Sequence, residues 1–567
     1  MAAGLSVTVR PAAAQTTYSP AKPDDAQLQL GERVYFKKCV WCHGPEGAGD
    51  GPGADRLWPR PRNFNQGTFK VRTTGSGELP TDEDLFLTVT NGLPGSAMPP
   101  WDGILSVDER KAVIAFVKAK LVKDRDFQDT EFEEFHIINF DGQVPSSPES
   151  IERGREVFMS KGKCVECHGK DGRGNGNLTQ KDDWGFPIFP ANLHQCWNFR
   201  GNRRDPYNPA NVFREVSTGL NGTPMPSFAD VLSVEERWDV ANFVISLCPK
   251  EANNPEAKNK IQMDPLTNKP KIYFVIGSLY TKDPLPTATD DPKWNEQLPY
   301  FVGLGGQITR RPQNFNRRIE NVWVKSIYND EEIAFLLEWD DRTDSKAEGS
   351  NMPPPMNVAD LTIPVAYYAN KHVFNEVVPT LYPNWKSLPQ PAIYNDAVAI
   401  QFPAKWQSLT PPERPFFIHG DPVKAVDLWK WENGAKPIAY TGKGVDDVKP
   451  RSDSLLKAEG AQFNEGVWRV IIKRPLKTED KEGDVQFEQG KYIPIAFQAW
   501  DGDNGEAGAR MALSAWYYLI LQPPVPTTAF IYPPIVAIAM VGIQWWVIRK
   551  AKSMQNGNGG GAGGKKK

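Results

Sequence analysis

The sequence predicts a multidomain chain in which two mainly helical modules precede an all-β sandwich and one C-terminal transmembrane helix. Three observations support this prediction. A segment that begins at residue 31 returns at residue 153, short runs of β-branched and aromatic residues follow residue 260, and an uncharged stretch lies at 529–548. A chain of 567 residues has room for about three or four domains of ordinary size.

An internal repeat defines the two helical modules. The segment GERVYFKKCVWCHGPEGAGDG at 31–51 returns as GREVFMSKGKCVECHGKDGRG at 153–173. Further along, NGLPGSAMPPWDGILSVDERKAVIAFV at 91–117 returns as TGLNGTPMPSFADVLSVEERWDVANFV at 218–244. Because the repeat includes both ends of the unit, we expect two copies of one domain.

Each copy contains the pattern Cys-x-x-Cys-His. The six residues are Cys39, Cys42 and His43 in the first copy and Cys164, Cys167 and His168 in the second. Two thiols at this spacing on a helical turn can form thioethers to the two vinyl groups of a porphyrin, and the adjacent histidine is then the proximal iron ligand. The pattern therefore predicts two haem c groups. A thioredoxin-like redox pair or half of a zinc site is the alternative, but the sequence lacks a βαβ context or a second cysteine pair.

Met98 and Met225 are the expected distal iron ligands. The interval from the first cysteine of the motif is nearly conserved, with 59 positions from Cys39 to Met98 and 61 from Cys164 to Met225. Each methionine lies in a Gly/Pro loop before an amphipathic helix that opens with Ser-Val-Asp-Glu or Ser-Val-Glu-Glu. A lone methionine is ordinarily core filler, and this alternative stays open at both positions. His/Met ligation would raise the reduction potential of each haem.

Both modules resemble class I cytochromes c. In that family an N-terminal helix, the Cys-x-x-Cys-His motif, a methionine loop and a C-terminal helix follow one another in this order. The resemblance covers 28–122 and 150–250, and we expect one cytochrome c domain in each range, preceded by a signal remnant and linker at 1–27.

The two remaining cysteines, Cys196 and Cys248, both lie in the second module. In an oxidising compartment they could form a disulfide between an inserted loop and the last helix. The sequence leaves this open, because it does not supply the distance between the two Cα atoms.

The sequence pattern changes after about residue 260. Short β-like runs are separated by turns, among them KIYFVIGS, EIAFLLEW, AVAIQFP, GVWRVIIKR and YIPIAFQAW. Such runs predict an all-β sandwich over 260–522. The runs EIAFLLEW and YIPIAFQAW are rich in β-branched and aromatic residues, which favours inner strands.

Four segments in this region resemble the ethylbenzene-dehydrogenase-type haem b domain: NDAVAIQFP at 395–403, GDPVKAVDLWKWENG at 420–434, IIKRPL at 471–476 and AWDGDNGEAGARMALSAWYYLIL at 499–521. The resemblance covers nearly all of 265–522. It implies the γ subunit of molybdenum enzymes related to dimethyl sulfoxide reductase, which include ethylbenzene and dimethyl sulfide dehydrogenases, chlorate and selenate reductases and nitrite oxidoreductase. Those γ subunits pass electrons between an iron-sulfur subunit and outside carriers.

The resemblance also implies two ligands for a haem b iron. The family typically uses a methionine before a Gly-Asp turn and a lysine before the last strand. In this sequence His419 occupies the first position and Met511 the second, and both side chains are competent iron ligands. A hydrogen-bonding histidine and a core methionine are the alternatives, and the other candidate ligands are Met352, Met356 and His372.

The two ends of the chain predict its location. The stretch at 529–548 is long enough to cross a hydrocarbon core as a helix, and the following tail at 549–567 is basic and Gly-rich. The positive-inside rule then leaves the C-terminus cytoplasmic and the domains periplasmic. A buried core helix is the alternative for 529–548. At the other end, Ala12-Ala13-Ala14 fits a signal cleavage site, although a positive n-region and a full apolar core are missing.

Composition and motifs narrow the function. The 66 basic and 69 acidic residues nearly balance, so the chain lacks the excess of positive charge that is typical of nucleic-acid binding. The sequence contains no nucleophile triad or phosphate loop, and acidic pairs such as Asp340-Asp341 are interpreted as solvated turns. We therefore expect an electron-transfer subunit rather than an enzyme.

The expected partners are the iron-sulfur and molybdopterin subunits of a membrane-bound oxidoreductase, most like nitrite oxidoreductase, together with a respiratory cytochrome or oxidase. A free-standing di-haem or tri-haem carrier of the respiratory chain is one alternative. A haem that loses Met98 or Met225 and turns over a small molecule is another, and a sandwich domain without haem that docks the cytochrome arm is a third.

Overall fold

The structure is a computed structural model. It describes residues 23–125, 127, 137–199, 205–248, 263–264, 269–310, 313–347, 393–405, 414–452, 455–524 and 528–557. Residues 1–22 of the expected signal remnant and linker at 1–27 lie outside the described residues, as do Met352, Met356 and His372.

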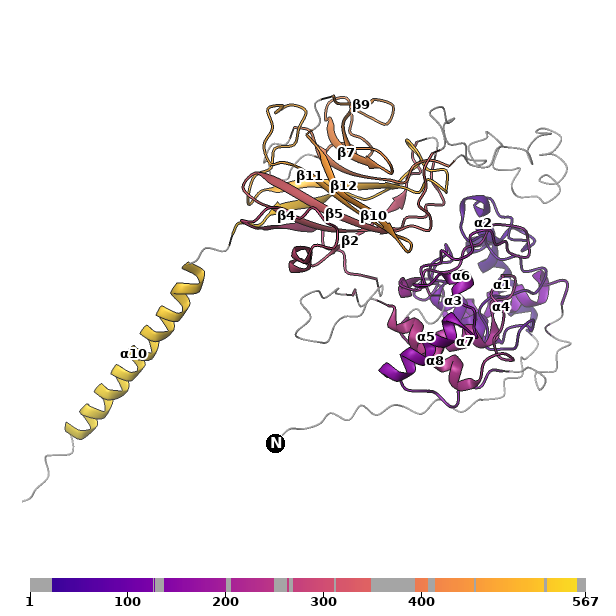
Figure 1. Ribbon diagram of the computed structural model, residues 1–567. Coiled ribbons are helices and arrows are strands. Elements are labelled where there is room, and N and C mark those ends of the chain that lie inside the picture. The colour runs from indigo at the N-terminus through magenta and orange to yellow at the C-terminus, as the bar shows by residue number, and fades with distance from the viewer. Residues whose placement is uncertain are drawn as a thin grey trace, which may run out of the picture.

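Two helical modules occupy the N-terminal half (Figure 1). The first module contains α1 (Asp25–Lys38), α2 (Val40–His43), η1 (Ala54–Arg56), α3 (Asp82–Asn91), α4 (Val107–Phe116) and the π-helical turn η2 (Val117–Leu121). The second module contains α5 (Pro148–Met159), α6 (Val165–His168), η4 (Cys196–Asn198), α7 (Pro209–Thr218) and α8 (Val234–Ser246). The helices of the two modules follow one another as the sequence repeat predicts.

Matching capping boxes start the last helix of each module. Ser106 accepts a hydrogen bond from the Glu109 amide at 3.1 Å, and the Glu109 carboxylate accepts one from the Ser106 amide at 2.8 Å. Ser233 and Glu236 repeat this arrangement with the same distances. Each box satisfies two amides that a helix start leaves without a partner. The predicted starts of α4 and α8 are therefore confirmed.

The first and last helices of each module cross at a glycine. A Cβ atom on Gly31 of α1 would lie well inside van der Waals contact of the Ala112 carbonyl oxygen in α4. A Cβ atom on Gly154 of α5 would meet the Asp239 carbonyl oxygen of α8 in the same way. Only glycine permits this approach, which brings the apolar faces of the two helices together around Tyr35 or Phe158.

We predict that Gly31→Ala destabilises the first module by about 3 kcal/mol, because the added methyl group must force α1 away from α4. Denaturant unfolding of the purified protein would measure the loss. Glu32→Ala is the matched control, since it changes the exposed neighbouring residue and should shift stability by less than about 0.5 kcal/mol. Equal stability of the two variants would contradict the close crossing.

The sandwich domain follows the modules. Its strands are β1 (Val275–Tyr280), β2 (Tyr300–Gly303), β3 (Gly305–Gly306), β4 (Asn321–Tyr328), β5 (Glu332–Asp340), β6 (Ala397–Pro403), β7 (Val426–Glu432), β8 (Ile438–Gly442), β9 (Val448–Pro450), β10 (Lys457–Asn464), β11 (Val467–Pro475), β12 (Tyr492–Trp500), β13 (Ala512–Leu513) and β14 (Tyr517–Leu521). They pair in the order β10-β11-β5-β4-β1-β14-β12-β6-β7-β8-β9. The strand β1 is parallel to both neighbours, whereas the other pairings along this path are antiparallel.

Aromatic contacts show that the two halves of this sheet stack on each other. Phe335 of β5 lies 6.1 Å between ring centroids from both Phe402 of β6 and Trp429 of β7. Trp339 of β5 lies 6.3 Å from Trp431 of β7. Since β5 and β6–β7 are far apart in the strand order, the sheet folds over a shared core, as a sandwich requires. The predictions that EIAFLLEW and YIPIAFQAW form inner strands are confirmed by β5 and β12.

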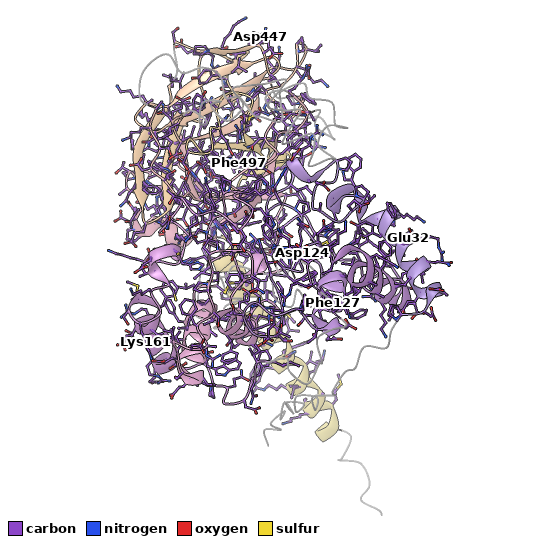
Figure 2. The ribbon with its side chains drawn as sticks, turned by 90° about the vertical axis from the view of Figure 1, so that its right-hand side faces the viewer. Glu32, Asp124, Phe127, Lys161, Asp447 and Phe497 are labelled. Atoms are coloured by element: carbon purple, nitrogen blue, oxygen red, sulfur yellow. A yellow bond between two sulfur atoms is a disulfide. The ribbon has the colours of Figure 1, made fainter. Side chains whose placement is uncertain are left out.

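Three folded units meet at one junction. The Arg318 guanidinium of the sandwich domain lies 3.7 Å from the ring centroid of Phe189 in the second module and 5.3 Å from that of Trp58 in the first. Close by, Asp340 forms an ion pair with Arg173 and accepts a hydrogen bond from Gln195 at 3.1 Å. Figure 2 shows Phe497 inside the sandwich domain, with Glu32 and Lys161 on the two helical modules below it.

A long helix, α10 (Thr528–Gly557), extends from the sandwich domain and lies clear of the modules (Figure 1). The apolar part at Ile531–Met554 has a mean hydropathy of 1.7 and is long enough to cross a membrane. The helix continues through Arg549, Lys550 and Lys552, so the prediction that a flexible tail begins at residue 549 is wrong. The guanidinium of Arg549 lies over the Trp545 ring at 4.8 Å, a contact one helical turn apart that favours continuing the helix.

Candidate haem sites

The Cys-x-x-Cys-His motifs form single helical turns. In the first module the His43 amide donates to the Cys39 carbonyl at 3.0 Å, and in the second the His168 amide donates to the Cys164 carbonyl at 2.8 Å. This turn places both cysteines of a motif beside the histidine, as thioether attachment requires. All four cysteines lie outside disulfides and are partly exposed. Burial raises the pKa of Cys39 to about 12 and that of Cys164 to about 11.

The two motif histidines are oriented in the same way. Nδ1 of His43 donates to the Arg62 carbonyl at 3.0 Å, and Nδ1 of His168 donates to the Ala191 carbonyl at 3.0 Å. Because a carbonyl only accepts, each bond fixes the tautomer in which Nε2 carries the lone pair. Burial lowers the pKa of His43 to about 4 and also lowers the pKa of His168. Both imidazoles are therefore neutral at physiological pH, which is the form that ligates iron, and the donors fit a haem.

The methionine loops are built alike. We define the Met98 loop as 92–98 and the Met225 loop as 219–225. The Leu93 amide donates to the Met98 carbonyl at 3.0 Å, and the Leu220 amide donates to the Met225 carbonyl at 3.0 Å. In both loops the methionine amide also donates to a hydroxyl two residues earlier, at 3.2 Å. Both methionines are half-buried, so part of each side chain lies outside the packed core.

Each module joins its haem motif and its methionine loop through one apolar cluster. Cys39 and Trp101 pack against the same core in the first module, and Cys164 and Phe228 do so in the second. Trp101 and Phe228 each follow the methionine by three residues. The structure thus gathers the predicted proximal and distal sides of each site around a common core.

Cys196 and Cys248 form a disulfide, with their Cα atoms 5.7 Å apart. The bond ties η4 to the chain just after α8 and lies in a small cluster with Ile245. The pairing that the sequence left open is therefore present in the structure.

His419 and Met511 lie next to the same strand of the sandwich domain. The His419 Nε2 atom is 3.0 Å from Oε1 of Gln498 in β12, and Met511 immediately precedes β13, where Leu513 pairs with Gln498. Both residues are buried, Met511 completely. Met511 packs in an apolar cluster that contains Ile418, the residue before His419.

The surroundings of His419 suit an iron ligand. The His419 Nδ1 atom is buried and has no hydrogen-bond partner among the described residues. Burial lowers the pKa of His419 to about 4, so the imidazole is neutral. The residue has a φ of 55°, which is uncommon for a side chain larger than glycine and typical of functional positions. The unpaired imidazole nitrogen of His419 is a suitable axial ligand, whereas the complete burial of Met511 in an apolar cluster leaves the core-methionine alternative open at that position.

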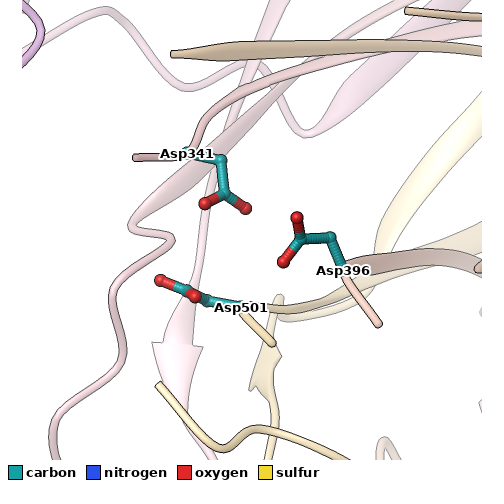
Figure 3. Close-up of side chains that lie close together, drawn as sticks. All are labelled: Asp341, Asp396 and Asp501. Atoms are coloured by element: carbon teal, nitrogen blue, oxygen red, sulfur yellow. The ribbon is translucent and has the colours of Figure 1, made fainter. Parts of the chain in front are cut away.

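A cluster of buried carboxylates was not predicted from the sequence. Asp341 follows β5, Asp396 precedes β6 and Asp501 follows β12, and one oxygen of each lies within 4.8 Å of the others. Figure 3 shows the three carboxylates pointing toward one another. The interpretation of Asp340-Asp341 as a solvated turn is therefore wrong, because Asp341 is buried in this acid cluster and Asp340 pairs with Arg173. The three positions are far apart in sequence, so no local pattern could reveal them.

Hydrogen bonds give the acid cluster a structural role. Asp396 accepts from the Ser345 amide at 2.6 Å, the Gly502 amide at 2.8 Å and the Trp468 indole at 3.1 Å. Asp341 accepts weaker bonds of 3.2 and 3.3 Å. Burial raises the pKa of Asp341 well above its ordinary value, and the charges of Asp501 and Asp396 act in the same direction. Burial also raises the pKa of Asp396 to about 7.

Stability of the sandwich domain should fall as the pH rises. A carboxyl whose pKa is raised in the folded state stabilises the fold below its unfolded pKa, and this contribution is lost as pH rises through the folded value. For the acid cluster this loss of stability begins near pH 3.8, the ordinary aspartate pKa, and continues to about pH 7 and above. Asp341→Asn, which mimics the protonated acid, should flatten this dependence and raise the melting temperature at neutral pH by about 2–4 °C per kcal/mol gained.

Thermal unfolding between pH 5 and pH 8 measures the effect. Asp503→Asn is the control, because Asp503 is an exposed acid in the same loop as Asp501. A steeper pH dependence in Asp341→Asn than in the wild-type protein would contradict the raised pKa of Asp341.

The paired modules, each with a haem-attachment turn, an oriented histidine and a methionine loop, are cytochrome c domains. Residues 26–117 and 149–244 match the family described as cytochrome C oxidase, cbb3-type, subunit III.

Two curated relatives are similar to this chain. One is the chlorate reductase subunit gamma of Ideonella dechloratans, 30% identical over 125 residues, which are 22% of this chain and 49% of the relative. The other is the cbb3-type cytochrome c oxidase subunit FixP of Sinorhizobium medicae, 28% identical over 159 residues, which are 27% of this chain and 42% of the relative. The chain thus spans about half the length of the curated relatives it matches.

A solved structure of the Kuenenia stuttgartiensis reducing HAO-like protein complex is also similar. It is 39% identical to this chain, with a TM-score of 0.35, and the match covers 39% of this chain and 96% of the other.

Proposed function

We propose that this chain is the membrane-anchored electron-transfer subunit of a respiratory molybdenum oxidoreductase. The observation that carries the proposal is the union, in one polypeptide, of two cytochrome c domains with a sandwich domain that buries a histidine and a methionine beside one strand. The likeness to a chlorate reductase gamma subunit supports it.

Each residue has a role in this proposal. Cys39, Cys42, Cys164 and Cys167 attach two haem c groups, His43 with Met98 and His168 with Met225 hold their irons, and His419 with Met511 hold a haem b iron. When bound, the haems supply one-electron transfer between two stable iron states. With both axial positions filled, the chain relays electrons and does not turn over a substrate.

The two cytochrome modules contact each other and the sandwich domain. The second module touches the sandwich domain close to its haem motif, through Arg173 and Asp340 and through the approach of Gly466 to Asn175. The first module packs against the second through Arg72 and Trp184. The first module also contacts the sandwich domain, through Arg56 and Phe315 and through Trp58 and Arg318, so the contacts allow electrons to pass from the sandwich domain to either module.

The partners in the proposal are an iron-sulfur subunit and a molybdopterin subunit on one side and a respiratory cytochrome or oxidase on the other. His/Met ligation supports a complex that releases electrons at high potential, such as a nitrite oxidoreductase. The candidate span in α10 would anchor the chain, and Arg549, Lys550 and Lys552 at its C-terminal end favour a cytoplasmic C-terminus and periplasmic domains.

A second candidate function is a haem c carrier attached directly to a terminal oxidase. The likeness of the cytochrome modules to FixP favours it. In that case the sandwich domain would be a docking scaffold, and the chain would copurify with an oxidase and without molybdenum.

A pyridine haemochrome spectrum of the purified protein tests the proposal. We expect two covalent haem c groups for one extractable haem b, because the chain carries two Cys-x-x-Cys-His motifs and one buried His/Met pair without thiols. Two haem c and no haem b would contradict the proposed binding of haem b by the sandwich domain.

Variants assign the haem b site. His419→Ala and Met511→Ala should each lower the haem b content while leaving haem c unchanged. His194→Ala is the matched control, since His194 is a partly buried histidine whose Nε2 lies 2.7 Å from the Asp171 carbonyl oxygen and which has no proposed iron. Unchanged haem b content in both ligand variants would contradict the assignment.

A further inference from the structure

The Met225 loop of the second module is held by a buried arginine of the first. Arg72 is completely buried. Its Nη2 donates to the Thr218 carbonyl at 2.7 Å, and its Nη1 lies 3.4 Å from the Gly219 carbonyl oxygen. Its Nε donates to the Gly75 carbonyl of its own module at 3.0 Å. The guanidinium therefore joins the two modules at the residues where the Met225 loop begins.

The physics of this contact favours a strong bond. Thr218 is the last residue of α7, so its carbonyl has no partner in the helix and lies at the negative end of the helix dipole. A cation at that end is stabilising, and a charged donor makes a stronger hydrogen bond than a neutral one. Nearby Asp84 and Glu78 of the first module partly balance the charge of Arg72.

Two further contacts connect the residues that Arg72 holds to Met225. Gly219 has a φ of 66°, and a Cβ atom there would lie 2.7 Å from the Pro226 carbonyl carbon and 3.0 Å from the Met225 oxygen. The start of the loop is therefore packed directly on its end. The Leu220 amide closes the loop by donating to the Met225 carbonyl at 3.0 Å.

Two further contacts fasten the middle of the loop to the first module. The Gly77 amide donates to Asn221 Oδ1 at 3.1 Å. On the other side, a Cβ atom on Gly222 would lie 2.9 Å from Arg62 Nη1, and the Arg62 guanidinium lies 4.4 Å from the Trp184 ring centroid. The Arg62 carbonyl accepts the hydrogen bond of His43, so the same residue contacts both haem sites.

We propose that docking of the first module determines whether Met225 stays on the iron of the second haem, with Arg72 as the positioning residue. This inference rests on the proposed function, in which Met225 is the distal ligand. Arg72 does not touch the iron; it acts by holding the carbonyls of Thr218 and Gly219. A rearrangement that separates the modules would release the loop and open one coordination position.

Imidazole titration of the full-length oxidised protein tests the proposal, since added imidazole competes with a methionine for ferric iron. In Arg72→Gln the apparent affinity at the second haem should rise about tenfold, because a charge-assisted hydrogen bond that favours the closed loop is lost. In the same variant, the charge-transfer absorption band of thioether-ligated ferric iron should weaken by the part that the second haem contributes. Met225→Ala identifies which titration phase belongs to that haem.

Asn221→Ala keeps the test independent of how well Arg72→Gln folds. It removes the acceptor of the Gly77 amide at an exposed contact and should shift the same phase in the same direction. Arg155→Gln is the control, because Arg155 is an exposed residue of α5 that pairs with Glu152 of the same helix. It should leave both phases unchanged.

Unchanged imidazole affinity in Arg72→Gln and Asn221→Ala would overturn the proposal. An equal rise at both haems, or the same rise in Arg155→Gln, would also overturn it, because it would indicate general loosening. A wild-type protein without two thioether-ligated c haems would instead refute the ligand assignment of the proposed function.

Discussion

The contact of Arg318 with Phe189 and Trp58 is the interaction on which the arrangement of the domains depends. Electron transfer between cofactors requires that their domains stay in close contact, and this side chain touches all three folded units at once. Burial lowers the pKa of Arg318 to about 10, and Asp501 and Glu506 oppose that shift, so the guanidinium stays charged at physiological pH. Its Nε donates to Asn504 at 3.2 Å, in the loop that also supplies Asp501 to the acid cluster.

The acid cluster and the junction are therefore parts of one structure. Asp341, Asp396 and Asp501 fasten the ends of β5, β6 and β12, and the loop after β12 carries the groups that orient Arg318. The cost of burying three carboxylates is offset by backbone and indole donors and by the nearby arginines. The same edge of the sandwich domain thus stabilises the fold of that domain and contacts the two cytochrome modules.

The features that the sequence predicted well are those encoded locally. The Cys-x-x-Cys-His turn needs only five adjacent residues, and the Ser106 and Ser233 caps need four, so their structures follow from the sequence itself. The acid cluster combines residues from three distant strands, and Asp341 looked like part of a polar turn. His419 and Met511 were suggested only by resemblance, since neither lies in a spacing that specifies a metal. The link from Arg72 to Thr218 spans two modules, and no periodicity within either one indicates it.

We propose that the chain relays electrons through iron centres whose axial positions are all filled by its own residues. Electron paramagnetic resonance of the oxidised full-length protein during a potential titration tests this most directly. We expect low-spin ferric signals from both c haems and from haem b, each lost in a one-electron step. A high-spin signal from either c haem in the wild-type protein would contradict it, because an open coordination position would indicate substrate binding and not electron relay.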